Sequence, residues 1–302
     1  MITDRLIERI IELQNPTCMG LDTSFDYLPD DMRAGANNFS DVAERIFDFN
    51  KKLIDTLYDV VPSVKVQIAY YEMYGAEGLK AYEATLKYAA EKGLVVIADA
   101  KRNDIGSTAA CYSKAFLGET EVNGARFSAF PSDFLTVNGY LGTDGIAPFV
   151  EDCAKRGKGI FVLVKTSNPS SGELQNLLLE NGTPVYEYMG GLVEKWGEPT
   201  AGRYGYSAVG AVVGATHPAE AASLRAKLPH TFFLIPGYGA QGANAEMLKC
   251  CFGKNGLGGV VNNSRGIICA YKKTGGTYYE AARAAALAMK KDLSETIGRM
   301  GK

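Results

Sequence analysis

Residues 94–106 read Leu-Val-Val-Ile-Ala-Asp-Ala-Lys-Arg-Asn-Asp-Ile-Gly. The first part, residues 94–100, is an aliphatic run rich in β-branched residues, which predicts a buried strand. Charged residues follow the run directly, and we expect residues 107–116 to form a helix. A strand that leads into a helix is the repeating unit of a parallel sheet.

The same alternation of short aliphatic runs and longer helical segments extends along the whole chain. Eight runs qualify as strands, namely Thr17–Asp22, Ser63–Ala69, Leu94–Ala100, Phe134–Asn138, Ile160–Lys165, Ala208–Gly214, Phe232–Pro236 and Gly259–Asn263. Eight strands that alternate with helices predict an α/β fold of the closed (β/α)8 type, the TIM barrel.

Helices are expected before, between and after these strands. They span Asn38–Val60, Ala76–Lys92, Ser107–Phe116, Gly145–Arg156, His217–Lys227, Ala243–Cys250 and Tyr278–Ile297, with a first helix at Ile2–Leu13 that should close the barrel floor. Ser170–Tyr206 is longer than a strand-to-helix connection needs. We expect an enlarged loop after strand 5, with a helix near Val185–Trp196, that serves as a lid or binding loop rather than as core. No linker or repeat is visible, so residues 1–302 are predicted to form a single domain.

Composition and charge exclude several classes of protein. The 302 residues include 32 Lys plus Arg and 34 Asp plus Glu, a net charge of −2, and no basic run is longer than a pair such as Lys272–Lys273, which argues against a nucleic-acid partner. No apolar run approaches the roughly 20 residues that span a membrane. Six cysteines without a C-x-x-C pair, and no signal peptide, indicate reduced thiols in the cytoplasm. Two histidines exclude a multi-histidine metal site.

Polar residues stand where the predicted strands end. In barrels of this type the working residues lie at the carboxyl ends of the strands, because the following loops surround one opening. The residues at these places are Asp22, Lys65, Asp99, Lys101, Ser167, Gln241 and Arg265. They are our candidates for the site.

Lys65, Asp99 and Lys101 form the most informative combination. Asp99 and Lys101 are two positions apart on one strand, so their side chains face the same side. Taken singly, an ordinary ion pair explains them, and Asp104 could simply cap the following helix. Lys65 changes this balance, because a lysine within the apolar run 63–68 is costly unless carboxylates compensate its charge. We therefore predict alternating lysines and aspartates at the barrel mouth.

Two glycine-containing loops predict a phosphate site. Residues 236–242 read Pro-Gly-Tyr-Gly-Ala-Gln-Gly, and residues 262–267 read Asn-Asn-Ser-Arg-Gly-Ile. The last two loops of such barrels often bind phosphate through backbone N–H groups, and Arg265 could hold two phosphate oxygens at once. A single loop of this kind could be a tight turn, but two of them at the expected strands favour a phosphorylated small-molecule substrate.

These residues also match a known family. The element Asp99-x-Lys101-x-x-Asp104, followed by Ile105 and Thr108, resembles the signature of the orotidine 5′-phosphate decarboxylases, in particular their longer bacterial branch. The similarity extends from residues 20–22 (Gly-Leu-Asp) to residues 264–266 (Ser-Arg-Gly) and so covers most of the chain. It implies a cofactor-free, metal-free conversion of orotidine 5′-phosphate to uridine 5′-phosphate, the final step of pyrimidine (UMP) biosynthesis.

The resemblance also implies which residues contact the substrate. Asp22 would hold a ribose hydroxyl, and Lys65 would contact the ribose while it keeps the neighbouring charges in order. Ser167 would recognise the edge of the pyrimidine. Gln241 and Arg265 would bind the phosphate.

The remaining implied roles concern the chemical step and the dimer. Asp99 would lie against the substrate carboxylate, and Lys101 would deliver a proton to C6 of the pyrimidine. Asp104, Ile105 and Thr108 would reach into the active site of a partner subunit, so the enzyme would be a homodimer. The implied catalytic residues are Lys65, Asp99, Lys101 and Asp104.

Two alternatives stay open at this point. A related sugar-phosphate decarboxylase or aldolase would share Asp-x-Lys-x-x-Asp but use magnesium, and it would need an acidic metal ligand on the second strand, where Lys65 stands. A non-catalytic nucleotide-binding barrel would need the phosphate loops but not the lysines and aspartates.

Overall fold

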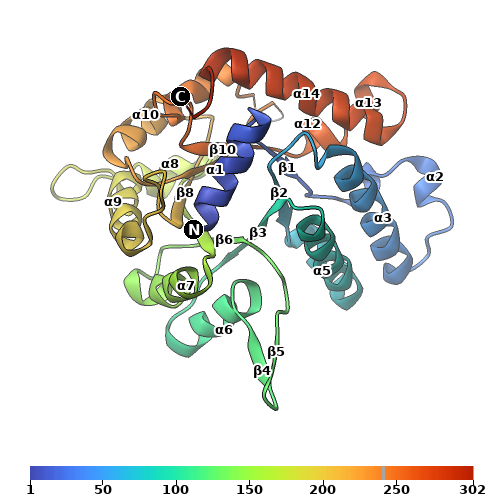
Figure 1. The fold of residues 1–302 in the computed structure, drawn as a ribbon, viewed down its shortest axis with the longest axis horizontal. Coiled ribbons are helices and arrows are strands. Elements are labelled where there is room, and N and C mark those ends of the chain that lie inside the picture. Colours follow the sequence, from blue (N-terminus) through green and yellow to red (C-terminus); the bar gives the residue numbers. More distant parts are fainter. Residues whose placement is uncertain (240–241, 302) are drawn as a thin grey trace.

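Eight parallel strands close into a barrel in the computed structural model, which describes residues 1–239 and 242–301 (Figure 1). Around the barrel the order is β1-β10-β9-β8-β7-β6-β3-β2, so neighbours in the chain are neighbours in the sheet. The strands are β1 (Thr17–Gly20), β2 (Ser63–Gln67), β3 (Val95–Arg102), β6 (Phe134–Val137), β7 (Gly159–Lys165), β8 (Val209–Val213), β9 (Phe233–Pro236) and β10 (Gly259–Asn263). The predicted TIM barrel is confirmed, and every predicted run overlaps one of these strands.

Helices surround this barrel (Figure 1). The longer ones are α1 (Ile2–Leu13), α3 (Phe39–Leu57), α5 (Gly75–Glu91), α6 (Gly106–Phe116), α7 (Thr143–Arg156), α9 (Val185–Gly197), α10 (Pro218–Lys227) and α14 (Tyr278–Ile297). Short helical segments are η1 (Phe25–Tyr27), α2 (Asp30–Arg33), α4 (Ala69–Glu72), η2 (Pro169–Ser171), α8 (Gly172–Gln175), η3 (Glu198–Thr200), α11 (Ala245–Leu248), η4 (Lys249–Cys251), α12 (Arg265–Ile268) and α13 (Tyr271–Thr274). The predicted helix at Ala243–Cys250 is divided between α11 and η4.

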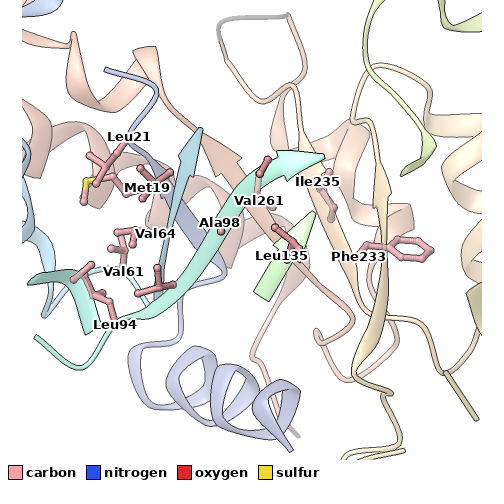
Figure 2. Close-up of a cluster of buried hydrophobic side chains, with 14 of the residues drawn as sticks. Met19, Leu21, Val61, Val64, Leu94, Ala98, Leu135, Phe233, Ile235 and Val261 are labelled. Carbon is pink, nitrogen blue, oxygen red and sulfur yellow. The ribbon is translucent and has the colours of Figure 1, made fainter. Parts of the chain in front are cut away.

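Two clusters of buried side chains build the core. The larger cluster fills the space between the strands and the outer helices, and Figure 2 shows part of it around Val64, Ala98 and Val261. The smaller cluster fills the barrel interior, where Phe134 and Phe161 stack with ring centroids 4.8 Å apart. Alternate residues of β3, β7 and β9 belong to the two clusters, as the two faces of a strand require.

Helix α1 closes the floor of the barrel, as predicted. Its apolar face, which includes Leu6, Ile7 and Ile10, is buried in the same cluster as the barrel interior. At the same end, the Thr3 hydroxyl donates a hydrogen bond to the carbonyl of Ser207, just before β8. With the floor sealed, the opposite end of the barrel remains for the site.

The enlarged segment after β7 has two different parts. Helix α9 lies at the predicted position, but its buried residues Tyr186 and Val193 belong to the main core cluster. The expectation that the segment is loop rather than core is therefore wrong for α9, which is the regular outer helix of this barrel unit. The additional length lies before it, in η2, α8 and the turn that leads to Val185.

A β-hairpin between α6 and β6 was not predicted. Strands β4 (Thr120–Val122) and β5 (Ala125–Phe127) pair antiparallel, and all six residues are exposed. Their turn is Asn123-Gly124, with φ values of 50° and 83°. Asn-Gly is the favoured pair for such turns, so the signal was present, but each strand is only three residues long.

Two further findings concern membranes and cysteines. Within residues 1–239 and 242–301, no helix has the length and apolar composition needed to cross a membrane. The six cysteines are free thiols.

Candidate active site

A cavity of about 480 Å³ opens at the carboxyl ends of the barrel strands. Six of the residues predicted from the sequence line it, namely Asp22, Lys65, Asp99, Lys101, Ser167 and Arg265. They come from the first, second, third, fifth and eighth strands of the barrel or from the loops that follow them. The fold thus brings together residues that are up to 243 positions apart in the chain (265 − 22).

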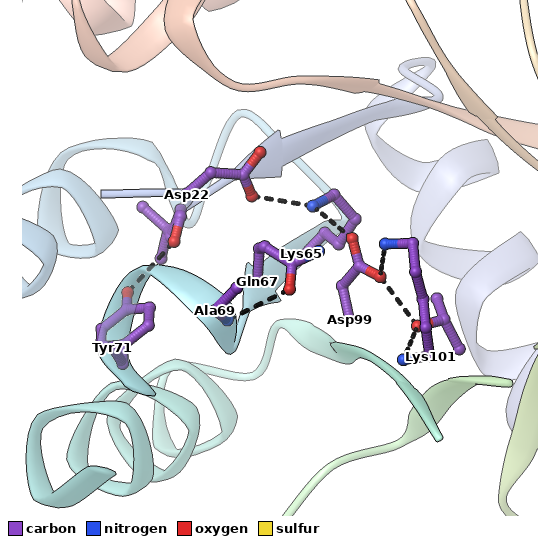
Figure 3. A network of polar contacts seen from close by, with 9 residues as sticks. Asp22, Lys65, Gln67, Ala69, Tyr71, Asp99 and Lys101 are labelled. Atoms are coloured by element: carbon purple, nitrogen blue, oxygen red, sulfur yellow. Dashed lines mark hydrogen bonds and ion pairs between the residues drawn. The ribbon is translucent and has the colours of Figure 1, made fainter. Parts of the chain in front are cut away.

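Four charged side chains form one connected group, which we call the charged array: Asp22, Lys65, Asp99 and Lys101 (Figure 3). Lys65 Nζ lies 2.8 Å from Asp22 Oδ1 and 2.9 Å from Asp99 Oδ2. The other oxygen of Asp99 lies 2.7 Å from Lys101 Nζ. The predicted compensation of Lys65 by carboxylates is confirmed, and opposite charges alternate along the group.

Each central member of the charged array is stabilised in its ionised form. Burial alone would raise the pKa of Asp99, but the ammonium groups of Lys65 and Lys101 hold it well below its usual range. Burial alone would lower the pKa of Lys65, but the carboxylates of Asp22 and Asp99 raise it above its usual value. Both groups are therefore charged at neutral pH.

Lys101 and Asp99 differ in how far solvent reaches them. The Lys101 side chain is 45% exposed, whereas that of Asp99 is 9% exposed. Lys101 also has a positive φ of 49°, and the pairing of β3 with β6 shifts register between Ala98 and Arg102. A left-handed residue other than glycine costs roughly 1–2 kcal/mol. The backbone thus departs from a regular strand at the residue that presents its ammonium to the cavity.

Thr136 is a site residue that the sequence reasoning missed. Its hydroxyl donates to Asp99 Oδ1 (2.8 Å) and accepts from the backbone N–H of Lys101 (3.0 Å). It therefore connects the carboxylate to the irregular backbone at Lys101. Thr136 is the third residue of β6 and points into the cavity, so the alternation of that predicted strand was the available signal.

A buried hydrogen-bond chain supports the backbone on both sides of Asp22. Tyr71 Oη donates to the carbonyl of Leu21 (3.1 Å) and accepts from Asn50 Nδ2 (2.8 Å), and the Thr23 hydroxyl donates to Asn50 Oδ1 (2.7 Å). All the residues in this series of hydrogen bonds are buried. The position of Asp22 is thus fixed by the outer helices α3 and α4.

The predicted phosphate loops lie at one side of the cavity. Gly237, Tyr238 and Arg265 line it, and Arg265 is the first residue of the short helix α12. Asn263 Oδ1 accepts a hydrogen bond from the N–H of Gly266 (3.1 Å), which orders the second loop. Gln241, the other predicted phosphate ligand, lies outside the described residues.

Ser167 lines the cavity from the loop after β7. Its carbonyl accepts a hydrogen bond from the Thr216 hydroxyl at 3.2 Å. Gly214, the residue directly after β8, is so close that a β-carbon there would lie 2.8 Å from the N and Cα atoms of Ser167. Two successive barrel units therefore fix the position of this residue.

Asp104, Ile105 and Thr108 lie outside the cavity. They occupy the start of α6, and among the described cavity-lining residues none of the three appears. Ile105 is 57% exposed. The simple capping role for Asp104 is wrong, because Ile105 is the N-cap residue of α6. Within the described residues, the one N–H that donates to the Asp104 carboxylate is that of Ile105 (2.8 Å), which precedes the helix.

The fold and this site together define the chain as a (β/α)8-barrel protein with an ionised lysine and aspartate group at the carboxyl ends of its strands, the arrangement of a barrel enzyme. Residues 18–274 match the model of the family described as "Orotidine 5'-phosphate decarboxylase / HUMPS family". The chain belongs to this family.

Individual relatives agree with the family match. The orotidine 5′-phosphate decarboxylase of Clostridium acetobutylicum is 43% identical over 98% of this chain and 100% of its own length. That of Clostridium perfringens strain 13 is 44% identical over 98% of this chain and 99% of its own length.

Solved structures share the fold over nearly the whole chain. A crystal structure from Streptomyces avermitilis has a TM-score of 0.81 at 31% identity and covers 98% of this chain and 95% of its own. The OMP decarboxylase of Leishmania donovani has a TM-score of 0.75 at 28% identity and covers 98% of each chain.

Proposed function

We propose that the charged array is the machinery with which this chain removes carbon dioxide from orotidine 5′-phosphate. The reaction itself is the activity for which the clostridial relatives are named, at 43% and 44% identity over nearly their full lengths. The chain is accordingly a carboxy-lyase of pyrimidine biosynthesis that forms UMP. The roles of individual residues below are part of the proposal.

The chemical step needs a cation beside the reacting carbon and a proton donor within reach. When the bond between C6 and the carboxylate breaks, its electron pair stays on C6 and the carboxylate leaves as carbon dioxide. Lys101 supplies both requirements, because its ammonium stabilises the negative charge on C6 and then transfers a proton to it. The partial exposure of Lys101 to the cavity supports this role.

Asp99 and Lys65 prepare the site for this step. Asp99 stays ionised beside Lys101 and would lie against the departing carboxylate, where it would destabilise the bound substrate more than the transition state and so lower the barrier. Lys65 keeps both Asp99 and Asp22 in place and would contact the ribose, a hydroxyl of which Asp22 would hold. The ion pairs are formed before substrate arrives, so little reorganisation is needed during the reaction.

The remaining cavity residues would hold the rest of the nucleotide. Arg265 and Gln241 would bind the phosphate, with Arg265 at the start of a helix that lines the cavity. Ser167 would recognise the pyrimidine edge from the opposite loop. Binding energy from the phosphate is then available to position the reacting end.

The proposal includes a homodimer in which residues 1–302 act as one domain of each subunit. Asp104, Ile105 and Thr108 would complete the partner's site. The exposure of Ile105, and the place of all three at the start of α6 outside their own cavity, support this arrangement. The proposed location is the cytoplasm, because the six cysteines are free thiols.

The observation that carries the proposal is the position of Lys65. Its ammonium contacts Asp22 and Asp99 at 2.8 Å and 2.9 Å, on the strand where the magnesium-dependent alternative needs an acidic ligand. A non-catalytic nucleotide-binding barrel would have no use for a buried lysine between two carboxylates, because such a group is costly to maintain.

The test is the ultraviolet absorbance of orotidine 5′-phosphate incubated with the protein and a metal chelator. We expect the absorbance to change as substrate becomes UMP, at the same rate with and without chelator. Unchanged absorbance together with tight nucleotide binding would favour the non-catalytic alternative, and a reaction that stops with chelator would favour the magnesium-dependent one.

A further inference from the structure

Lys165, the last residue of β7, is buried without a carboxylate partner. Its residue is 0% exposed, and its ammonium donates to Asn176 Oδ1 at 2.7 Å and to Ser171 Oγ at 3.4 Å. The ring of Tyr186 lies 5.5 Å from the same nitrogen. Within the part of the chain that the structure describes, Lys165 forms no salt bridge. It differs in this respect from Lys65, whose charge two carboxylates compensate.

This arrangement is costly, so a lysine here needs a reason. Burial lowers the pKa of Lys165, and the more distant carboxylate of Glu220 on α10 opposes this only in part. An apolar side chain of similar length would fill the same space without the cost of removing an ammonium from water. What the lysine adds is a pair of hydrogen bonds, and both go to the segment that follows it.

That segment, residues 166–176, forms a loop that we call the 166–176 loop. The Gln175 side chain accepts from the N–H of Thr166 (3.0 Å) and donates to the Thr166 hydroxyl (2.8 Å), which closes the loop at its base. The Thr166 hydroxyl in turn donates to Asn168 Oδ1 at 2.6 Å. Lys165 holds the far side of the same loop through Asn176 and Ser171. The loop is therefore tied at its base and along its return path.

The 166–176 loop carries three consecutive cavity-lining residues, Thr166, Ser167 and Asn168. Lys165 itself is not among the described residues that line the cavity, so it can act on a ligand only through this loop. On the other side of Ser167, Gly214 and Thr216 limit its movement. Ser167 therefore belongs to a loop that Lys165 contacts, and it packs against residues 214–216, which follow β8.

We propose that Lys165 is a positioning residue for pyrimidine recognition, which it serves by fixing the 166–176 loop so that Ser167 faces the base of the bound nucleotide. The inference rests on the proposed function, because it takes the ligand to be a pyrimidine nucleotide. The extra chain length after β7 then has a function, because it supports Ser167, the residue that contacts the base. The phosphate end of the cavity, at Arg265, does not depend on it.

The test compares two ligands that share ribose and phosphate but differ in the base. Affinities of UMP and of ribose 5-phosphate are measured for the natural protein and for Lys165→Met. We expect UMP to bind roughly tenfold more weakly, which is the loss of about one net hydrogen bond. Ribose 5-phosphate should bind within about twofold of its original affinity, because its contacts lie elsewhere.

A double-mutant cycle with Ser167→Ala makes the test specific for positioning. If Lys165 acts through Ser167, Lys165→Met should weaken UMP binding far less in the Ser167→Ala protein than in the natural one. The matched control is Lys158→Met, which removes a partly buried lysine next to the other end of β7, where its Nζ contacts Asp133. It should leave both affinities unchanged.

A second variant, Asn176→Ala, keeps the lysine but removes its hydrogen bond to the loop. Because Asn176 is exposed, this variant should fold even if Lys165→Met does not. It should weaken UMP binding in the same way and leave ribose 5-phosphate binding unchanged. Three results would overturn the inference: unchanged UMP affinity, equal weakening of both ligands, or an effect of Lys165→Met that is fully additive with Ser167→Ala. A failure of the proposed function is separate, because it would appear as a natural protein that binds these ligands but does not turn over orotidine 5′-phosphate.

Discussion

Lys101 Nζ lies 2.7 Å from Asp99 Oδ1, although Lys101 has a left-handed backbone conformation with a φ of 49°. Two residues at this spacing on a regular strand would face the same side without any such departure. Here the pairing of β3 with β6 shifts register around Lys101, and the Thr136 hydroxyl accepts a hydrogen bond from the Lys101 N–H at this irregular position. The carboxylate is thereby enclosed between two ammonium groups, and one of them remains open to the cavity.

The ionised Asp99 carboxylate should make the free energy of unfolding depend on pH in the acid range. Because its folded pKa lies below the unfolded value of about 3.9, its contribution is present above that value and is lost as the pH falls through the folded pKa. Asp99→Asn should lower the free energy of unfolding at pH 7 by roughly 3–5 kcal/mol, the usual loss from a broken buried pair. Urea unfolding at pH 7 and below pH 4 checks this.

The same measurement on Asp30→Asn is the control, since Asp30 pairs with Arg33 at the surface with its side chain 94% exposed. Asp30→Asn should behave like the natural protein at both pH values. A stability difference between the natural protein and Asp99→Asn that stays constant down to the acid range would contradict the proposed charge state of Asp99.

Thr136→Val should slow turnover without weakening nucleotide binding. The substitution keeps the shape of the side chain but removes the hydrogen bonds to Asp99 and to the N–H of Lys101. Hydrogen bonds to charged groups contribute about 1.5–3 kcal/mol, so kcat should fall by roughly 10- to 100-fold. Steady-state kinetics and UMP binding measure the two effects.

Thr231→Val serves as its control, because Thr231 is also buried and hydrogen-bonded but lies before β9, near the barrel floor. An equal loss of kcat in both variants would mean that Thr136 acts only through general stability.

Gly214→Ala should weaken binding of the pyrimidine. The new methyl group would lie 2.8 Å from the backbone of Ser167, too close for a real contact, so Ser167 must move. We expect a higher KM for orotidine 5′-phosphate and unchanged affinity for ribose 5-phosphate. Gly191→Ala is the matched change, since a β-carbon there meets no atom of the described chain within 4 Å. Normal KM in the Gly214→Ala protein would show that Ser167 does not contact the base.

Mixing two inactive variants tests whether the site is shared between subunits. Asp104→Ala and Lys101→Ala should each be inactive alone, but a mixed dimer contains one site in which both residues are intact. Activity should therefore return after the subunits exchange, up to roughly a quarter of the natural value for random mixing in a two-fold dimer. No recovery, despite exchange confirmed by mass or fluorescence, would contradict a shared site.

The barrel could be predicted from the sequence because each strand is a distinct aliphatic run and its neighbour in the chain is also its neighbour in the sheet. Lys65, Asp99 and Lys101 were found for the same reason, since strand ends converge on one opening. Thr136 was missed because a threonine in an apolar strand carries no charge signal. The support of Ser167 by Lys165 and Gly214 depends on side-chain contacts between successive barrel units, which periodicity does not reveal.

The Lys101 ammonium should act mainly on the transition state, so the decisive variant is Lys101→Ala. Turnover of orotidine 5′-phosphate and the affinity of UMP are measured for this variant and for Lys80→Ala, which alters a lysine on α5 whose side chain is 71% exposed. We expect Lys101→Ala to lose turnover while its UMP affinity changes little, and Lys80→Ala to retain both. Near-normal turnover by Lys101→Ala would show that the Lys101 ammonium is not the proton donor.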